Sequence, residues 1–321
     1  MFEKEILGIV LGILQGLFEW IPVSSEGQLV IVLSQIWKIS TNNAISLALF
    51  AHIGTALVIF IYYRKEYLNM IKAGFTVAIN WFSETIHPEA IQRTITPKEQ
   101  RDFNLFLRVA VVTIATVPTA FLSLFLLEDI LNFFNDFLHI NSYELITAIV
   151  GIFLIITGLI LHYRPKLSEE ISTEKQFSEI PLIQAIILGL LQGFTALPGI
   201  SRSGITVTYL LTGSKLDQNE SLKASFLVGA PVTLGAGFLQ VVRGKIFFFP
   251  SGIADETNTI IMSYLGAFLL ILAAFIVGAI TLKAFLELAR KTEFDYFLII
   301  FGMIALLAVV FAPILASLFL G

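Results

Sequence analysis

The chain has 321 residues, of which 56% are hydrophobic and only 14% are charged, and its mean hydropathy is +0.86. Soluble domains carry about 25% charged residues, so this composition excludes an ordinary soluble enzyme and a disordered chain. The formal net charge of −4 provides no basic field for a nucleic acid, and the absence of cysteine excludes disulfides and thiolate metal sites. A membrane protein is the class that remains.

The first apolar stretch, residues 6–21, is too short to cross a bilayer. Pro22 and the polar turn Ser24-Ser25-Glu26-Gly27 interrupt it, and an apolar run resumes over 28–37. At 1.5 Å per residue each arm reaches only about 15–24 Å, against about 30 Å for the hydrocarbon core. We therefore predict a re-entrant helical hairpin, in which the chain enters the membrane and returns to the same side.

Further along the chain, six segments are long and apolar enough to cross the bilayer, because a span needs about 20 mostly apolar residues. An amphipathic stretch between the first two, residues 68–82, is expected to lie at the membrane surface. The six predicted spans are residues 44–62, 104–127, 143–163, 222–242, 260–282 and 296–319.

A second interrupted stretch lies between the third and fourth spans. Residues 182–197 are apolar, Pro198-Gly199 breaks the run, and it resumes over 204–213. We predict a second re-entrant hairpin here. With both hairpins returning to their own sides, one face carries 14 of the 20 Lys and Arg residues and the other carries four. We therefore predict that the basic face is cytoplasmic and that both termini lie on the outer side of the cell membrane.

The two hairpins are related by an internal repeat with an offset of 177 residues. Nine of 22 aligned positions are identical without a gap, and the pairs include Gln and Ser as well as Gly, Ile, Leu and Val. Each half, about 1–165 and 177–321, is one hairpin followed by three spans, so the second half enters the membrane inverted. The predicted fold class is an all-α polytopic membrane protein: a single domain of six transmembrane helices and two re-entrant hairpins in an inverted-topology repeat.

The two hairpin tips carry complementary charges. Glu19 aligns with Ala196, and Ser25 aligns with Arg202, so one hairpin contributes a carboxylate and the other a guanidinium. Gln15 shares a helix face with Glu19. Ionisable residues at membrane depth are functional candidates. The alternative is a buried ion pair that only joins the hairpins.

The second tip has the composition of a phosphate site. Arg202 is surrounded by the hydroxyls of Ser201, Ser203 and Thr206, and a helix is expected to begin at about residue 203. A guanidinium, hydroxyl groups and the free N–H groups of a helix N-terminus together suit a phosphate group.

Two motifs identify a family that this chain resembles. The stretches Gln15-Gly-Leu-Phe-Glu19-Trp-Ile-Pro-Val-Ser-Ser-Glu-Gly-Gln28 and Pro198-Gly-Ile-Ser-Arg-Ser-Gly-Ile-Thr206 resemble the undecaprenyl pyrophosphate phosphatases, the BacA-type bacitracin-resistance proteins. The resemblance covers nearly the whole chain. It implies hydrolysis of a polyprenyl diphosphate to the monophosphate and inorganic phosphate, which recycles the lipid carrier of cell-envelope synthesis.

The resemblance also assigns residue roles. It implies that Glu19 is the essential acid, that Gln15 occupies the Glu/Gln position beside it, and that Arg202 binds phosphate. The nucleophile is Ser25 or water. The residues predicted to bind substrate are Gln15, Ser24, Gln28, Ser201, Ser203 and Thr206.

One position departs from the family pattern. The family has a catalytic His where this chain has Gln28, which can only donate or accept hydrogen bonds. His52, in the first predicted span, is the candidate for that proton chemistry, with packing in the core as the alternative.

The resemblance also implies a divalent cation, Mg²⁺ or Ca²⁺, for which Glu19 and Glu26 are the candidate ligands. The expected partners are the polyprenyl diphosphate and the bilayer, with no nucleic acid. The sequence leaves the oligomeric state open, a homodimer included. The alternative function is a polyprenyl-phosphate transporter or flippase, which the inverted repeat and the missing His favour.

Overall fold

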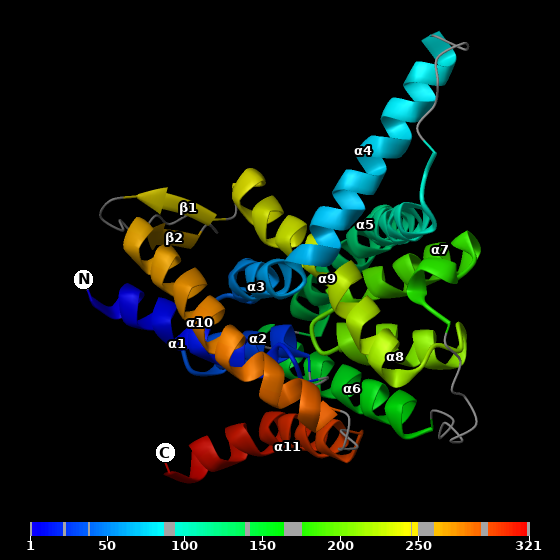
Figure 1. The fold of residues 1–321 in the computed structure, drawn as a ribbon. Helices are drawn as coiled ribbons and strands as arrows, with labels where there is room; N and C mark the ends of the chain where they lie inside the picture. Colours follow the sequence, from blue (N-terminus) through cyan, green and yellow to red (C-terminus); the bar gives the residue numbers. More distant parts are fainter. Residues whose placement is uncertain are drawn as a thin grey trace.

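The computed structural model describes residues 2–21, 24–37, 39–86, 94–138, 142–163, 175–244, 246–249, 260–289 and 295–319. Within these ranges nearly all of the chain is helical (Figure 1). The α-helices are α1 (Phe2–Phe18), α2 (Ser25–Gln35), α3 (Thr41–Tyr62), α4 (Arg64–Ile86), α5 (Pro97–Leu138), α6 (Ser142–His162), α7 (Leu182–Gly193), α8 (Arg202–Thr212), α9 (Gln218–Val242), α10 (Tyr264–Ala289) and α11 (Asp295–Phe319). Single 3₁₀ turns lie at Phe177–Glu179 and Phe194–Ala196.

The first predicted hairpin is a broken helix in the structure. Helix α1 ends at Phe18 and α2 begins at Ser25, so residues 6–37 do not form one straight helix. Ser24 has a left-handed backbone with φ 56°, and its hydroxyl accepts a hydrogen bond from the Gly27 N–H. This bond caps α2 and directs the chain into the second arm.

The second predicted hairpin is broken in the same way. The chain leaves α7 through a 3₁₀ turn and passes Gly199, whose φ of +104° favours glycine. Ser201 then caps α8 by accepting a hydrogen bond from the Gly204 N–H at 3.1 Å. The two breaks are confirmed, whereas the re-entrant path through a bilayer stays a prediction.

Four of the predicted spans coincide with helices of sufficient length and hydropathy among the described residues: Thr41–Tyr62, Pro97–Phe133, Gln218–Val242 and Tyr264–Glu287. The predicted spans 143–163 and 296–319 are also helical, in α6 and α11, but their described apolar parts are shorter. The chain is thus a multi-pass helical membrane protein, and the total of six spans stays a prediction.

The expectation of an all-α fold is wrong in one detail. Two short parallel strands, β1 (Ile246–Phe249) and β2 (Ile260–Ser263), pair between α9 and α10. The predicted span 260–282 therefore begins as a strand, and α10 starts only at Tyr264. Both strands are rich in β-branched or aromatic residues, which fit the pleated backbone, and hydropathy alone does not separate such a run from a helix.

Helix α4 contains the amphipathic stretch 68–82 and extends away from the other helices (Figure 1). Its exposed side chains include the large rings of Phe75, Trp81 and Phe82. Contact with the membrane surface would shield them from water, and it stays a prediction.

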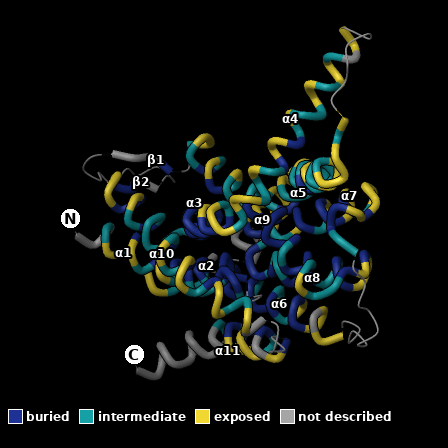
Figure 2. The backbone as a smooth tube through the Cα atoms, in the orientation of Figure 1, coloured by how far each residue is buried: buried dark blue, intermediate teal, exposed yellow. Residues whose placement is uncertain are grey.

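Glycine residues allow the hairpin arms to approach long helices closely. A Cβ added at Gly12 of α1 would overlap the carbonyl oxygen of Leu270 in α10, and one added at Gly193 of α7 would overlap Thr119 of α5. The first arm of each hairpin is thus packed backbone to backbone on a long helix. Helix α3 lies among these helices and is largely buried along its length (Figure 2).

The helix starts follow the offset of the sequence repeat. Helices α2 and α8 begin at Ser25 and Arg202, and helices α3 and α9 begin at Thr41 and Gln218. Both differences are 177 residues (202 − 25 and 218 − 41). The division into 1–165 and 177–321, and the inversion of the second half, stay predictions.

The close packing of α1 on α10 gives a first prediction. Gly12→Ala should lower the free energy of unfolding by about 1–3 kcal/mol, because the added methyl group meets backbone that cannot move alone. The measurement is thermal unfolding in detergent. Gly74→Ala in α4 is the matched control, since its added methyl group would lie at an ordinary 3.6 Å from Phe106. Equal melting temperatures for the two variants would contradict the close contact.

Candidate active site

The two hairpin tips line a cavity of about 340 Å³ together with helices α5 and α9. The polar residues at or beside the tips are Glu19, Ser24, Ser25, Glu26, His52, Ser201, Arg202 and Ser203. Most of the remaining wall is apolar, including Val117 and Phe121 of α5 and Val232 and Leu239 of α9.

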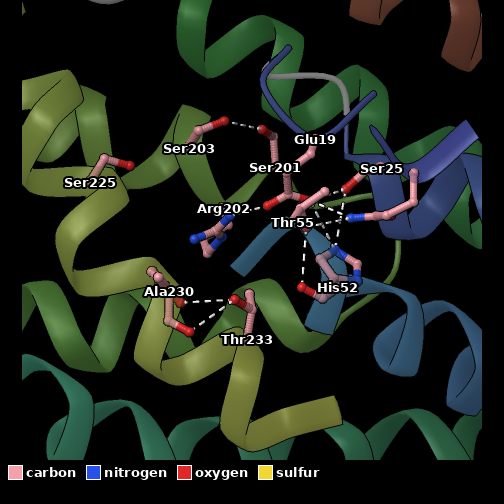
Figure 3. Close-up of polar contacts among 12 residues, drawn as sticks. Glu19, Ser25, His52, Thr55, Ser201, Arg202, Ser203, Ser225, Ala230 and Thr233 are labelled. Carbon is pink, nitrogen blue, oxygen red and sulfur yellow. Dashed lines mark hydrogen bonds and ion pairs between the residues drawn. The ribbon is translucent and has the colours of Figure 1, made fainter. Parts of the chain in front are cut away.

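The carboxylate of Glu19 is the centre of the polar cluster (Figure 3). It is 6% exposed, and its Oε1 is paired directly with the Arg202 guanidinium. Its Oε2 accepts hydrogen bonds from Gln15 Nε2 at 2.5 Å and from Ser25 Oγ at 3.0 Å, and lies 3.3 Å from His52 Nε2. Four helices or turns therefore converge on one carboxylate.

Glu19 and Arg202 are in direct contact as an ion pair, so the two hairpin tips converge and no gap of the size of a phosphate group separates the two charges. Opposite charges in apolar surroundings attract strongly, and each is the other's main source of compensation for lost hydration.

His52 has a defined tautomer. Its Nδ1 lies 2.7 Å from the Ala48 carbonyl oxygen, which can only accept a hydrogen bond, so Nδ1 carries a proton. In the neutral ring the lone pair is then on Nε2, which lies 3.2 Å from Ser25 Oγ. The Ser25 hydroxyl donates its proton to Glu19 here, and rotation about its C–O bond would direct that proton to the imidazole instead.

Ser24 joins the two tips. Its Oγ accepts a hydrogen bond from the Gly199 N–H at 3.0 Å, in addition to the one from Gly27. A Cβ at Gly27 would lie 2.8 Å from the Gly199 nitrogen, so the two turns touch through their backbones. Ser24 lines the cavity, but its hydroxyl is engaged in holding Ser25 opposite Arg202.

Three predicted binding residues, Gln15, Gln28 and Thr206, lie outside the cavity wall. The Thr206 hydroxyl lies 2.6 Å from Ser225 of α9 and donates to the Arg202 carbonyl oxygen at 2.8 Å. Thr206 is fully buried on the side of α8 that packs against α9, and it is absent from the residues lining the cavity, as is Gln28. Gln15 acts on the site only through Glu19, while Ser201 and Ser203 remain at the cavity beside Arg202.

Several residues of the site were not found from the sequence. Thr55 accepts a hydrogen bond from Gln15 at 3.3 Å. A Cβ at Gly229 of α9 would overlap the Arg202 guanidinium, so this glycine leaves the space that Arg202 occupies. Gln192 also lines the cavity. It aligns with Gln15 in the internal repeat, and this alignment is the one feature of the sequence that could have predicted Gln192 as a site residue.

The predicted metal ligands were compared with the needs of a divalent cation. Both oxygens of Glu19 are already engaged by protein donors, whereas Glu26 is buried with no hydrogen-bond partner for its Oε1. Among the described residues, no group of three His, Asp or Glu side chains gathers in one place. Mg²⁺ commonly binds through one or two carboxylates together with water and substrate phosphates, so Glu19 and Glu26 remain the candidate ligands and the cation stays a prediction.

Comparison with known proteins identifies the family. The family model described as bacitracin resistance protein BacA matches residues 8–307. The chain belongs to the BacA family. Relatives named undecaprenyl-diphosphatase include one from Methanococcoides burtonii, 30% identical over 93% of this chain and 96% of the relative, and one from Methanothrix thermoacetophila, 31% identical over 93% and 94%. A third, from Thermosipho africanus, is 30% identical over 92% and 97%.

Family membership confirms the resemblance that the two motifs indicated. In this BacA protein the imidazole beside the hairpin serine comes from His52 of α3, and Gln28 does not face the cavity. A histidine from a neighbouring helix thus lies next to Ser25, even though the first motif lacks one.

The contact between the two turns gives a second prediction. Gly27→Ala should push the tips apart, lower the free energy of unfolding by about 1–3 kcal/mol, and reduce turnover by up to about 10²-fold through misplacement of Ser25. Thermal unfolding and phosphate release are the two measurements. Gly74→Ala again serves as the control. Wild-type turnover in Gly27→Ala would show that the contact between the tips does not position the site.

Proposed function

We propose that this BacA-family protein is a membrane phosphatase that hydrolyses the terminal phosphoanhydride of a polyprenyl diphosphate. The products are the polyprenyl monophosphate and inorganic phosphate, and the reaction recycles the lipid carrier for cell-envelope synthesis. The observation that carries the proposal is the cluster of Glu19, Ser25, His52 and Arg202 in a cavity whose remaining wall is mostly apolar. The relatives named undecaprenyl-diphosphatase support the same activity.

The cavity suits an amphipathic substrate. Its polar residues offer a guanidinium and hydroxyl groups, which suit the diphosphate. Its apolar walls suit a prenyl chain, and Val117 and Phe121 of α5, which line the cavity, are each about half exposed. The prenyl chain would therefore pass between α5 and α9 into the bilayer.

Phosphate binding would exchange one partner of Arg202 for another. The guanidinium, now paired with Glu19, would turn to the oxygens of the terminal phosphate, with Ser201, Ser203 and the N-terminus of α8 as further donors. These groups neutralise charge on the transferred phosphoryl group, which is the main requirement of phosphoryl transfer.

Ser25 is the nucleophile that the geometry favours. Its Oγ would attack the terminal phosphorus while His52 Nε2 takes the hydroxyl proton, and that proton would then pass to the departing monophosphate. Water would next attack the phosphoserine, with His52 accepting a proton from the water and returning it to Ser25 Oγ. Glu19 would orient Ser25 and stabilise the imidazolium.

The membrane arrangement belongs to the same proposal. We place the protein in the cell membrane with six spans, two inverted halves and both termini outside. The equal offset of 177 residues between the starts of α2 and α8 and of α3 and α9 supports the two related halves. A divalent cation stays a prediction.

A third prediction tests the phosphate site. Arg202→Lys should lower turnover by about 10- to 100-fold, because lysine keeps the charge but loses the planar pair of donors. The measurement is phosphate release from a polyprenyl diphosphate by purified protein in detergent, together with thermal unfolding. Arg243→Lys, at an exposed position, is the matched control. Turnover near wild type in Arg202→Lys would contradict the assignment, and wild-type protein that binds the lipid without releasing phosphate would favour a carrier.

A fourth prediction tests the general base. His52→Ala should reduce turnover by about 10²–10⁴-fold, the usual contribution of general acid–base catalysis. Gln28→His should change turnover little, because residue 28 does not face the cavity. His162→Ala is the control, since His162 pairs with Asp295 elsewhere in the fold. If turnover rises clearly in Gln28→His and does not fall in His52→Ala, the general base belongs at residue 28 instead.

A further inference from the structure

Helix α9 has a missing backbone donor close to the site. Pro231 lies inside the helix and has no N–H, so the Leu227 carbonyl, four residues earlier, lacks its ordinary helical partner. Leu227 is 1% exposed, so water does not readily replace that partner. A buried carbonyl without a donor is costly in an apolar environment, and such a break needs a substitute.

Tyr67 of α4 provides the substitute. Its hydroxyl donates a hydrogen bond to the Leu227 carbonyl oxygen at 2.8 Å, across 160 residues of sequence. The Tyr67 ring is held against Phe60, with ring centroids 4.6 Å apart. Burial raises the pKa of the Tyr67 hydroxyl above its ordinary value, so the group remains a donor throughout the physiological pH range.

The same turn of α9 forms the seat of Arg202. The guanidinium occupies the space beside Gly229, two residues after Leu227. Thr233 donates to the Gly229 and Ala230 carbonyl oxygens at 3.1 and 3.2 Å, and Ala230 and Thr233 lie near Arg202 in Figure 3. The positive charge of Arg202 also reaches Tyr67, where it offsets part of the rise in pKa.

We propose that Tyr67 is a positioning residue for Arg202: its hydrogen bond to the Leu227 carbonyl sets the backbone of α9 around Pro231, and that backbone holds the guanidinium where the substrate phosphate binds. The inference rests on the proposed function, because it takes Arg202 as the phosphate-binding group. Tyr67 itself touches neither the substrate nor the reacting atoms.

Inorganic phosphate, a product of the proposed reaction, is the probe. In Tyr67→Phe the inhibition constant for phosphate should rise about three- to tenfold, and kcat/KM should fall by a similar factor, as expected for loss of one buried hydrogen bond. The phosphate-induced rise in melting temperature should shrink as well, which gives a readout independent of turnover. Tyr209→Phe is the matched control, because it removes another tyrosine hydroxyl from the same hydrophobic cluster.

A double variant separates positioning from general stability. Pro231→Ala restores an N–H for the Leu227 carbonyl, so adding Tyr67→Phe to it should cause no further loss of phosphate affinity. If Tyr67→Phe lowers phosphate affinity as much in the Pro231→Ala background as it does in the wild type, the inference is overturned. A Tyr67→Phe protein that melts earlier but keeps wild-type phosphate inhibition and the wild-type phosphate-induced melting shift would also overturn it, and this test needs only the single variant.

The Arg202→Lys variant distinguishes a failure of the proposed phosphate site from a failure of the positioning role of Tyr67. If phosphate inhibits Arg202→Lys as strongly as it inhibits the wild type, the assignment of Arg202 as the phosphate-binding group is refuted. If phosphate inhibition is weaker in Arg202→Lys but unchanged in Tyr67→Phe, only the positioning role of Tyr67 is refuted.

Discussion

Glu19 and Arg202 bring opposite charges into an apolar protein from hairpins that are 183 residues apart in sequence. Neither charge is tolerable alone at such a position, because desolvation is costly without a partner. Gln15, Ser25 and His52 surround the same carboxylate. Pairing the charges therefore brings together the Ser25 hydroxyl, the His52 imidazole and the Arg202 guanidinium, the groups to which the proposed function assigns roles.

The backbone allows this pairing through contacts that leave no room for side chains. Gly27 meets Gly199 where the turns touch, Gly12 lets α1 approach α10, and Gly229 leaves space for the guanidinium. Proline and glycine also interrupt the helices, so polar turns lie at the depth of the apolar arms. Such irregular backbone is tolerated in a membrane only where it is buried in protein or lines a cavity, and the tips do both here.

The ion pair bears directly on the proposed reaction. Glu19 pairs with the guanidinium that would bind the diphosphate, so substrate binding would exchange a carboxylate for a phosphate. Such an exchange would keep Arg202 neutralised, which would limit the cost of substrate entry in surroundings with a low dielectric constant. In this proposal, the release of Glu19 would coincide with the arrival of the substrate beside Ser25 and His52.

The amino-acid sequence by itself determined the helical membrane class, both hairpin breaks and the acidic and basic tips, because apolar length, proline, glycine and charge act locally. It missed the two strands, since an apolar run of β-branched and aromatic residues suits either state. Only the tertiary structure decided that Thr206 faces α9, that His52 rather than Gln28 lies beside Ser25, and that Tyr67 replaces the donor lost at Pro231. These relations depend on which faces of distant helices pack together, and no local pattern encodes that choice.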